Sequence, residues 1–302
     1  MVPAATAAKI IIWYAGKIGV IQMITASVVL YNTPYLVFWE LLQSYKPDAD
    51  RKLYIIDNSN METAYCKEIE NETIQYCFNG KNLGYGAAHN IGIRQALAEH
   101  SEYHLVLNPD IKFDSSIIDV LKNYADRHKD VVYMLPKVLY PNGEIQYLCK
   151  LLPTPLDLIG RRFLPKKLTQ RRNDRYILKS SGYDKIINPP CLSGCFMFMR
   201  TSVLKEKRLE FDERFFLYCE DFDLMRRLHA VGKTIYYPKV QIVHNHEQDS
   251  YKNWKMLFTH MKSACIYFNK YGWVVDKERR DMNRRILEEL GDGTGNPVEA
   301  ES

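Results

Sequence analysis

The sequence has little that would support a disulfide-stapled or zinc-bound protein. Its seven cysteines are an odd set, and no two of them have CxxC spacing. Neither a disulfide framework nor a structural zinc site is indicated, and a reducing compartment fits best. Most of the cysteines are expected to be small core residues.

A long, uninterrupted apolar run is also missing. The most apolar stretch, residues 7–24, is broken by Lys9 and Lys17, and it is too short and too charged to be read as a membrane span. It also lacks a clear small-residue cleavage site. Because Met23 stands directly before the first convincing strand, we interpret residues 1–22 as an upstream extension or leader, with a surface-lying anchor as the alternative.

The chain carries no strong excess of one charge, with a formal net charge of +5 over 302 residues. Its 46% hydrophobic and 25% charged content allows one large α/β domain, or two small ones, with a real core. The basic residues instead gather in two stretches, 161–175 and 277–285. Clustered positive charge favours an anionic partner, and composition alone leaves open a pyrophosphate, an anionic membrane surface or nucleic acid.

Three apolar runs in the first half of the chain, residues 24–31, 53–56 and 103–107, each end in polar or turn residues. Helical patterns at residues 35–44 and 87–100 separate them. The order β-α-β-α-β predicts an α/β fold with an open, mostly parallel or mixed sheet flanked by helices. Ligands of such sheets bind at the carboxyl ends of the strands.

The second half of the chain has a mixed pattern and no internal repeat. Residues 151–183, with three prolines and many arginines, are interpreted as a long mobile loop. Residues 251–290 are expected to form amphipathic helices and residues 291–302 a disordered tail. The remaining predicted elements are a helix at 115–128, a strand at 131–135, a hairpin-like turn at 140–144, a strand at 191–199, a helix at 220–231 and a strand at 234–243.

The turn Asn108-Pro109-Asp110 follows a predicted buried strand. A carboxylate fixed there by a proline is well placed for Mg²⁺ or Mn²⁺, which take oxygen ligands and share them with substrate phosphates. Capping of the next helix or stabilisation of the turn explains the same residues. From this tripeptide alone, the structural role is the favoured interpretation.

Two glycines, Gly84 and Gly86, precede a predicted helix opened by small residues. Glycines let a ligand approach the backbone, and a helix N-terminus favours anions. The layout is close to that of a dinucleotide-binding site, but the third glycine position is His89 and two predicted strands already precede the motif. A tight turn packed by small residues is an equally good explanation.

Glu220, Asp221 and Asp223 lie in the first turn of a predicted helix, after a run of aromatic residues. The helix dipole favours acids there, so capping is one explanation. If Glu220 and Asp221 emerge from an apolar wall, either suits the role of a general base. His244 and His246, just after a strand, are candidates for a metal site or for binding a diphosphate, although a lone histidine is more often structural.

Taken in order, these motifs resemble the glycosyltransferase family 2 enzymes with the GT-A fold, and among them the rhamnosyltransferase-like members of bacterial polysaccharide assembly. The resemblance covers about residues 27–273 and rests on seven ordered motifs: Val28-Val29-Leu30-Tyr31-Asn32, Ile55-Ile56-Asp57-Asn58-Ser59, Asn82-x-Gly84-x-Gly86-x-Ala88-x-Asn90-x-Gly92, Leu107-Asn108-Pro109-Asp110, Ser193-Gly194-Cys195, Glu220-Asp221-x-Asp223-Leu224 and Val243-His244. It implies a GT-A catalytic domain at residues 23–250, with a nucleotide-binding half at about 23–112 and an acceptor half at about 113–250.

The resemblance implies a role for each matching position. Asp110 would be the last acid of the family's Asp-x-Asp motif, and Asn108 replaces the first acid, which leaves one certain carboxylate for Mg²⁺ or Mn²⁺. Asp221 would be the catalytic base, with Glu220 less favoured, and His244 would contact the metal or the diphosphate. Residues implied to bind the nucleotide-sugar are Tyr31, Asn32, Asp57, Asn82, Gly84, Gly86, Asn90 and Asn108, and those expected to contact the acceptor or diphosphate are Gly194, Arg161 and Arg162.

The implied reaction is an inverting, metal-dependent transfer of a sugar to a glycan or lipid-linked saccharide, with L-rhamnose from dTDP-rhamnose as the best interpretation and a UDP-hexose as the alternative donor. The protein is expected to lie in the cytoplasm, and peripheral contact with the anionic inner face of the plasma membrane is an alternative. No nucleic-acid partner is expected. Packing against the catalytic domain or dimerisation would equally explain the C-terminal apolar stripe.

Three rival functions are ranked lower. An NAD-dependent oxidoreductase would use the glycine segment but leaves Glu220 and Asp221 without a role. A nucleotidyltransferase normally has a glycine- and basic-rich loop where Asn32-Thr33-Pro34 stands. A binding protein with a decayed active site fits poorly with so many intact polar positions.

Overall fold

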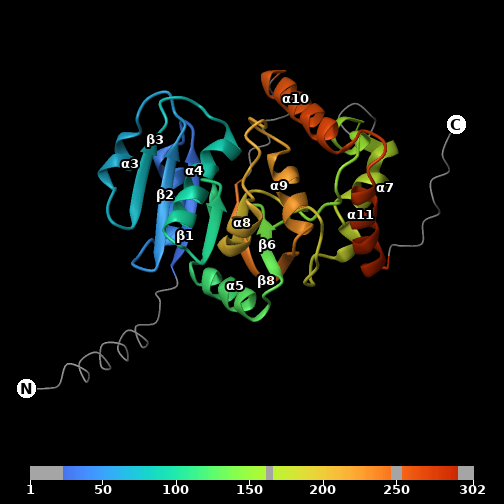
Figure 1. Ribbon diagram of the computed structural model, residues 1–302, viewed down its shortest axis with the longest axis horizontal. Coiled ribbons are helices and arrows are strands. Elements are labelled where there is room, and N and C mark those ends of the chain that lie inside the picture. The colour runs from blue at the N-terminus through green and yellow to red at the C-terminus, as the bar shows by residue number, and fades with distance from the viewer. Residues whose placement is uncertain (1–22, 161–165, 246–253, 292–302) are drawn as a thin grey trace, which may run out of the picture.

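The computed structural model describes residues 23–160, 166–245 and 254–291, and these residues form one eight-stranded sheet with helices around it (Figure 1). The strand order is β3-β2-β1-β4-β7-β6-β8-β5. The strands are β1 (Ile24–Leu30), β2 (Arg51–Asp57), β3 (Ile74–Phe78), β4 (Tyr103–Leu107), β5 (Ile111–Lys112), β6 (Val131–Leu139), β7 (Phe196–Arg200) and β8 (Lys233–His244).

The sheet is mixed, with parallel pairing in its N-terminal part. β1 pairs in parallel with β2 and β4, and β2 pairs in parallel with β3. Beyond β4 the pairs β4–β7, β6–β7 and β5–β8 are antiparallel, whereas β6–β8 is parallel. β1 and β4 are mostly apolar and almost fully buried, as expected for strands covered on both faces, and His104 of β4 makes hydrogen-bond contacts with Thr25 and Ser27 of β1. The predicted fold class is confirmed.

The helices lie on both faces of the sheet and at one of its ends. They are α2 (Tyr35–Tyr45), α3 (Ala64–Glu68), α4 (Tyr85–Ala98), α5 (Ser116–Arg127), α7 (Lys166–Tyr176), α8 (Thr201–Lys207), α9 (Glu220–His229), α10 (Trp254–Tyr271) and α11 (Lys277–Glu289), with a π-helix η1 (Leu156–Gly160) and a 3₁₀-helix η2 (Lys179–Ser181). α4 packs so closely on β1 that a Cβ atom at position 92 would lie 2.5 Å from Cβ of Ser27.

Two predictions for the second half need correction. The stretch 151–183 is not irregular throughout, because it contains η1, α7 and η2. α7 is polar on almost every side, so it shows no apolar periodicity, and it is held by contacts such as the 2.8 Å ion pair between Arg172 and Asp157. The strand predicted at 191–199 is shorter, since β7 begins at Phe196 and Cys191 forms only an isolated bridge with Lys150.

The C-terminal helices α10 and α11 belong to the packed body of the protein. Figure 1 shows them beside α7, at the end of the molecule away from β3 and α3. Ala264, Tyr267 and Phe268 of α10 are buried in a cluster with Cys219 and Phe222, whereas Trp254 and Phe258 are exposed. The apolar stripe of α10 is thus partly core and partly surface. None of the helices in the described residues is long and apolar enough to cross a membrane.

Candidate active site

The carboxyl ends of β1 and β2 carry a loop organised by Asp57. This side chain is fully buried and accepts hydrogen bonds from the backbone N–H groups of Ser59 (2.9 Å) and Thr63 (3.1 Å) and from the Tyr76 hydroxyl (2.7 Å). Burial alone would raise the pKa of Asp57, but these hydrogen bonds outweigh it and lower the pKa. In this conformation Asp57 shapes the loop and offers no surface to a ligand, unlike the direct nucleotide contact expected from the sequence.

Beside this loop, Tyr31 and Asn32 at the end of β1 are exposed. The backbone N–H of Asn32 donates to Ser59 Oγ at 2.8 Å, which joins the ends of β1 and β2. Next to them, the amide of Asn58 lies 3.2 Å from the carbonyl oxygen of Gly84 and 3.3 Å from Oδ1 of Asn82. The exposed Tyr31, Asn32 and Asn82 lie at the strand ends where a nucleotide is expected to bind, and the buried Asn58 holds the loop of Asn82 beside them.

The glycine segment at the start of α4 packs against protein rather than leaving room for a ligand. Gly84 has a φ of +88°, and a Cβ atom there would lie 2.2 Å from the carbonyl oxygen of Phe216. A Cβ atom at Gly86 would lie 2.8 Å from Cβ of Phe211. Asn90 is fully buried and exchanges hydrogen bonds of 2.9 and 3.0 Å with the backbone of Phe211. Residues 211–216 therefore occupy the space beside the Cα atoms of these glycines, which agrees with the packing explanation of this segment.

At the end of β4, Asn108 is held by Tyr85, a residue that the sequence did not single out. The Tyr85 hydroxyl lies 3.0 Å from Oδ1 of Asn108 and 2.8 Å from the carbonyl oxygen of Gly194. The backbone N–H of Asn108 donates to the carbonyl of Cys195 at 2.9 Å. Tyr85 thus links the start of α4, the end of β4 and the segment before β7.

Asp110 and His244 face each other at the start of β5 and the end of β8. Nε2 of His244 lies 3.3 Å from Oδ1 of Asp110, and its Nδ1 lies 3.1 Å from Oε1 of Gln146. Burial alone would lower the pKa of His244, but the neighbouring Cys195 and Asp110 outweigh it and raise the pKa to about 10. Gln146 also donates to the His244 carbonyl at 2.7 Å, so the imidazole is fixed in orientation.

This pair fits a metal that is shared with a substrate. Among the described residues, no cluster of three or more His, Cys, Asp or Glu side chains could by itself hold an ion. Asp110 supplies oxygen, and His244 supplies nitrogen once a metal replaces its Nε2 proton, a donor set that Mn²⁺ accepts. Mg²⁺ or Mn²⁺ commonly takes its remaining ligands from phosphates and water. A metal here would depend on the diphosphate of the donor for its other ligands.

The N-terminus of α9 presents Asp221 and hides Glu220. The two preceding residues, Tyr218 and Cys219, both have positive φ angles (68° and 65°), so the backbone is strained where it delivers the acids. Asp221 is partly exposed and its Oδ1 accepts from the N–H of Phe222 at 2.8 Å. Burial raises the pKa of Asp221, and the charge of Lys150 offsets part of that rise. A raised pKa is what a general base needs near neutral pH.

Glu220 is 5% exposed, and its Oε2 atom has no hydrogen-bond partner in the described part of the chain. Burial, reinforced by the charge of Asp221, raises the pKa of Glu220 well above its usual value. Gly194 borders the Asp221 side chain, because a Cβ atom at Gly194 would lie 3.3 Å from Cβ of Asp221. Asp221 is therefore the acid of the pair that a substrate can reach.

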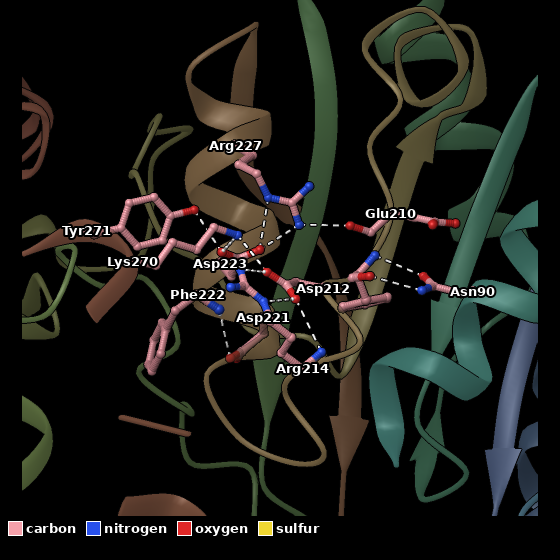
Figure 2. Close-up of polar contacts among 11 residues, drawn as sticks. Asn90, Glu210, Asp212, Arg214, Asp221, Phe222, Asp223, Arg227, Lys270 and Tyr271 are labelled. Atoms are coloured by element: carbon pink, nitrogen blue, oxygen red, sulfur yellow. Dashed lines mark hydrogen bonds and ion pairs between the residues drawn. The ribbon is translucent and has the colours of Figure 1, made fainter. Parts of the chain in front are cut away.

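The third acid of α9, Asp223, is fully buried, and its carboxylate contacts side chains of α9 and α10 (Figure 2). Arg227 and Lys270 each place a nitrogen 2.6 Å from its carboxylate, and the Tyr271 hydroxyl donates at 2.7 Å. On the same helix, Arg226 forms ion pairs of 2.6 Å with Asp276 and 2.7 Å with Glu278. Arg226 thus fixes α9 to the start of α11, Lys270 and Tyr271 fix it to α10, and Arg227 pairs with Asp223 inside α9.

A sequence profile described as Glycosyl transferase family 2 matches residues 36–206, more than half of the chain. The chain belongs to glycosyl transferase family 2. Two similar proteins are rhamnosyltransferases, as the resemblance implied. The N-acetylglucosaminyl-diphospho-decaprenol L-rhamnosyltransferase of Mycobacterium tuberculosis is 28% identical over 64% of this chain and 67% of its own length. The rhamnosyltransferase WbbL of Escherichia coli is 27% identical over 76% and 86%.

Solved structures place this glycosyltransferase in the GT-A fold. S. aureus TarS residues 1–349 match with a TM-score of 0.52 and 15% identity, over 89% of this chain and 80% of that one. GalNAc-T7, solved with UDP, GalNAc and Mn²⁺, matches with a TM-score of 0.58 and 14% identity, over 89% and 57%. At these identities the likeness establishes the fold, and the sheet and its flanking helices agree with it.

Some expected site residues of the glycosyltransferase lie outside the described residues, namely Arg161, Arg162 and His246. Tyr85, Gln146 and Lys150 are the contacts that sequence reasoning missed. Each acts on a residue that lies far from it along the chain. The tyrosine inside the glycine segment was the one visible signal, because Tyr85 stands between Gly84 and Gly86.

Proposed function

We propose that this glycosyltransferase transfers L-rhamnose from dTDP-rhamnose, with inversion, to a saccharide acceptor linked to a lipid diphosphate. The observation that carries the proposal is the Tyr85 hydroxyl, which contacts both Asn108, beside the Asp110–His244 pair, and Gly194, beside Asp221. Tyr85 thereby connects the segment proposed to bind the diphosphate with the segment that borders the proposed base. The two rhamnosyltransferase relatives support the choice of sugar.

In the proposed reaction, Asp221 accepts the proton of an acceptor hydroxyl. The hydroxyl oxygen forms a bond with the anomeric carbon from the face opposite the diphosphate, while the bond between that carbon and the diphosphate oxygen breaks. A divalent metal held by Asp110 and His244 would neutralise charge on the departing diphosphate. The partly buried site around Asp221 keeps its pKa above the usual range, which makes the carboxylate a stronger base.

Tyr31, Asn32, Asn58 and Asn82 line the strand ends on which we place the nucleotide. A UDP-hexose donor is the alternative, and it is motivated by the GT-A structures solved with UDP. We further propose that the reaction takes place at the cytoplasmic membrane surface, because the acceptor named for the mycobacterial relative is a decaprenol diphosphate.

The test compares transfer from dTDP-rhamnose and from UDP-hexoses, with Mn²⁺, Mg²⁺ or EDTA, to N-acetylglucosaminyl-diphospho-citronellol. We expect product only from dTDP-rhamnose and only with metal. Asp221→Asn should reduce turnover by about 10³-fold or more while nucleotide binding is retained, and Glu220→Gln should lose much less. Transfer from a UDP-hexose alone would replace the donor assignment, and an active Asp221→Asn enzyme would refute the base.

A further inference from the structure

Lys150 lies next to the proposed base in a segment that α11 holds in place. Its backbone N–H donates to the carbonyl of Cys191 at 2.8 Å, in an isolated antiparallel bridge. Two residues later, Leu152 exchanges hydrogen bonds of 2.8 and 2.9 Å with the side chain of Asn283. Arg279, also in α11, donates to the carbonyl of Pro153 at 3.3 Å. The position of Lys150 is therefore built by the fold.

The Lys150 ammonium lies over the ring of Phe222, 5.5 Å from its centroid, and Phe222 directly follows Asp221. Lys150 is half-buried, and within the described ranges it forms no hydrogen bond or ion pair through its ammonium. Contact with a ring face compensates a desolvated cation only weakly. A carboxylate or phosphate would satisfy this ammonium much better.

The positive charge of Lys150 affects the pKa values of the groups around it. Burial raises the pKa of Asp221, Cys191 and Cys219, and in each case Lys150 acts in the opposite direction. The two cysteines, with Leu152 and Phe222, pack against residues of α10 and α11. By contrast, the Asp110–His244 pair lies at the start of β5 and the end of β8. The ammonium thus lies beside the base on the side of the C-terminal helices.

We propose that Lys150 binds a phosphate group carried by the acceptor. The inference rests on the proposed function, because it takes Asp221 as the base that receives the acceptor hydroxyl. An acceptor whose hydroxyl reaches Asp221 brings the next few atoms of its sugar beside Phe222 and Lys150. A phosphate attached to that sugar then lies close to the ammonium of Lys150 and forms an ion pair with it. The enzyme would therefore bind phosphorylated, lipid-linked acceptors more tightly than neutral glycans.

Binding of citronellyl diphosphate in EDTA, measured by calorimetry, tests the site apart from catalysis and apart from the metal. We expect Lys150→Met to weaken binding about 10- to 100-fold and Lys150→Arg to change it less than about threefold. Saturating dTDP should leave this binding unchanged. Equal binding by the wild type and Lys150→Met would overturn the proposal. So would displacement of the probe by dTDP, because the probe would then occupy the donor site.

Transfer assays separate this inference from the proposed function. The wild type is expected to prefer N-acetylglucosaminyl-diphospho-citronellol over octyl N-acetylglucosaminide, and Lys150→Met should reduce that preference in kcat/KM at least about tenfold, mainly through KM. Thermal unfolding of each variant checks that the fold is intact. If the wild type transfers sugar and Lys150→Met keeps the full preference, the inference alone fails. If the wild type transfers no sugar from any donor, the proposed function fails. The binding test with citronellyl diphosphate then still decides whether Lys150 binds a phosphate group.

Discussion

The ammonium of Lys270 lies 2.6 Å from the carboxylate of Asp223, so α10 is bound to the helix that carries the proposed base. The same ammonium lies 2.8 Å from the carboxylate of Asp212, so Lys270 also joins α10 to the loop before α9 (Figure 2). Together with the Arg226–Asp276 pair, this makes the C-terminal helices part of the support of the active site.

Replacing Asp223 with asparagine is expected to destabilise the protein by about 3 kcal/mol, because Arg227 and Lys270 would lose the buried carboxylate between them. Urea unfolding measures the change. The matched control is Lys67→Gln, which removes an exposed pair with Glu62 and should cost less than about 0.5 kcal/mol. Equal costs for the two variants would contradict a structural role for Asp223.

Gly194→Ala tests the fit between Gly194 and the proposed base. The new Cβ atom would lie 3.3 Å from Cβ of Asp221, so the acid must shift by a few tenths of an ångström. We expect kcat to fall about tenfold, with nucleotide binding retained, since small displacements of a catalytic group are costly. Gly143→Ala, at a position with nothing within 4 Å, should keep the wild-type kcat. Unchanged kcat in Gly194→Ala would show that Asp221 tolerates the displacement.

Gly84→Ala separates packing from ligand binding in the glycine segment. With a φ of +88° and the carbonyl of Phe216 at 2.2 Å, alanine should cost about 3 kcal/mol of stability without any nucleotide present. Gly80→Ala, which also has a positive φ but meets only a ring atom at 4.0 Å, should cost about 1 kcal/mol. A stable Gly84→Ala variant that has lost nucleotide affinity would restore the view that this glycine faces the ligand.

Acid should weaken the fold through His104. Its ring nitrogens lie 2.8 Å from Thr25 Oγ1 and 2.9 Å from Ser27 Oγ, and burial lowers its pKa to about 3. An unfolded histidine titrates near pH 6.5. Below that pH the unfolded chain therefore binds a proton at position 104 that the folded chain does not bind. The contribution of a neutral His104 is complete above about pH 6.5 and is lost as the pH falls toward about 3.

Urea unfolding at pH 7, 6 and 5 measures this effect against His104→Gln, whose side chain does not titrate. The wild type should lose more stability than the variant, by up to about 1.4 kcal/mol for each pH unit below 6.5. The comparison cancels the opposing contributions of buried acids such as Glu220. Parallel curves for the two proteins would mean that His104 is protonated in the folded state.

The exposed part of α10 is expected to contact lipid. Trp254 is 85% exposed and Phe258 is 73% exposed on one side of the helix. Apolar side chains at a membrane interface contribute binding in proportion to the area they bury. Flotation with anionic vesicles should fall at least about fivefold in the double variant Trp254→Ser, Phe258→Ser. The control is Leu36→Ser, which removes a 72% exposed leucine of α2. Equal flotation of all three proteins would end the idea.

The sequence predicted the N-terminal strands well because local pattern determines them. β1 and β4 are mostly apolar stretches bounded by turn residues, and their ends were placed to within one residue. α7 was missed because a helix that is polar on nearly every side lacks an apolar stripe, and its position depends on contacts such as Arg172–Asp157.

Among the site residues, Asp110, His244 and Asp221 could be proposed from their place after strands and at a helix start. For Asn90 and Asp57, the sequence did not reveal the hydrogen-bond partners that hold these two side chains. Asn90 bonds residue 211, and Asp57 bonds the turn that follows it. Lys150 gives no sequence signal, since Phe222 and Cys191 become its neighbours only in the folded chain.

The hydrogen bond from Leu152 to Asn283 joins residues that are 131 positions apart. By contrast, β1 to β4 and the helices between them come from one continuous stretch, residues 24–107. During synthesis on the ribosome, this stretch emerges and can pair its strands long before α11 exists. These N-terminal strands can therefore pair early, whereas the segment of Lys150 gains its anchor only when α11 emerges. A chain whose α11 is still inside the ribosome lacks the contacts to Leu152 and Pro153 that fix this segment.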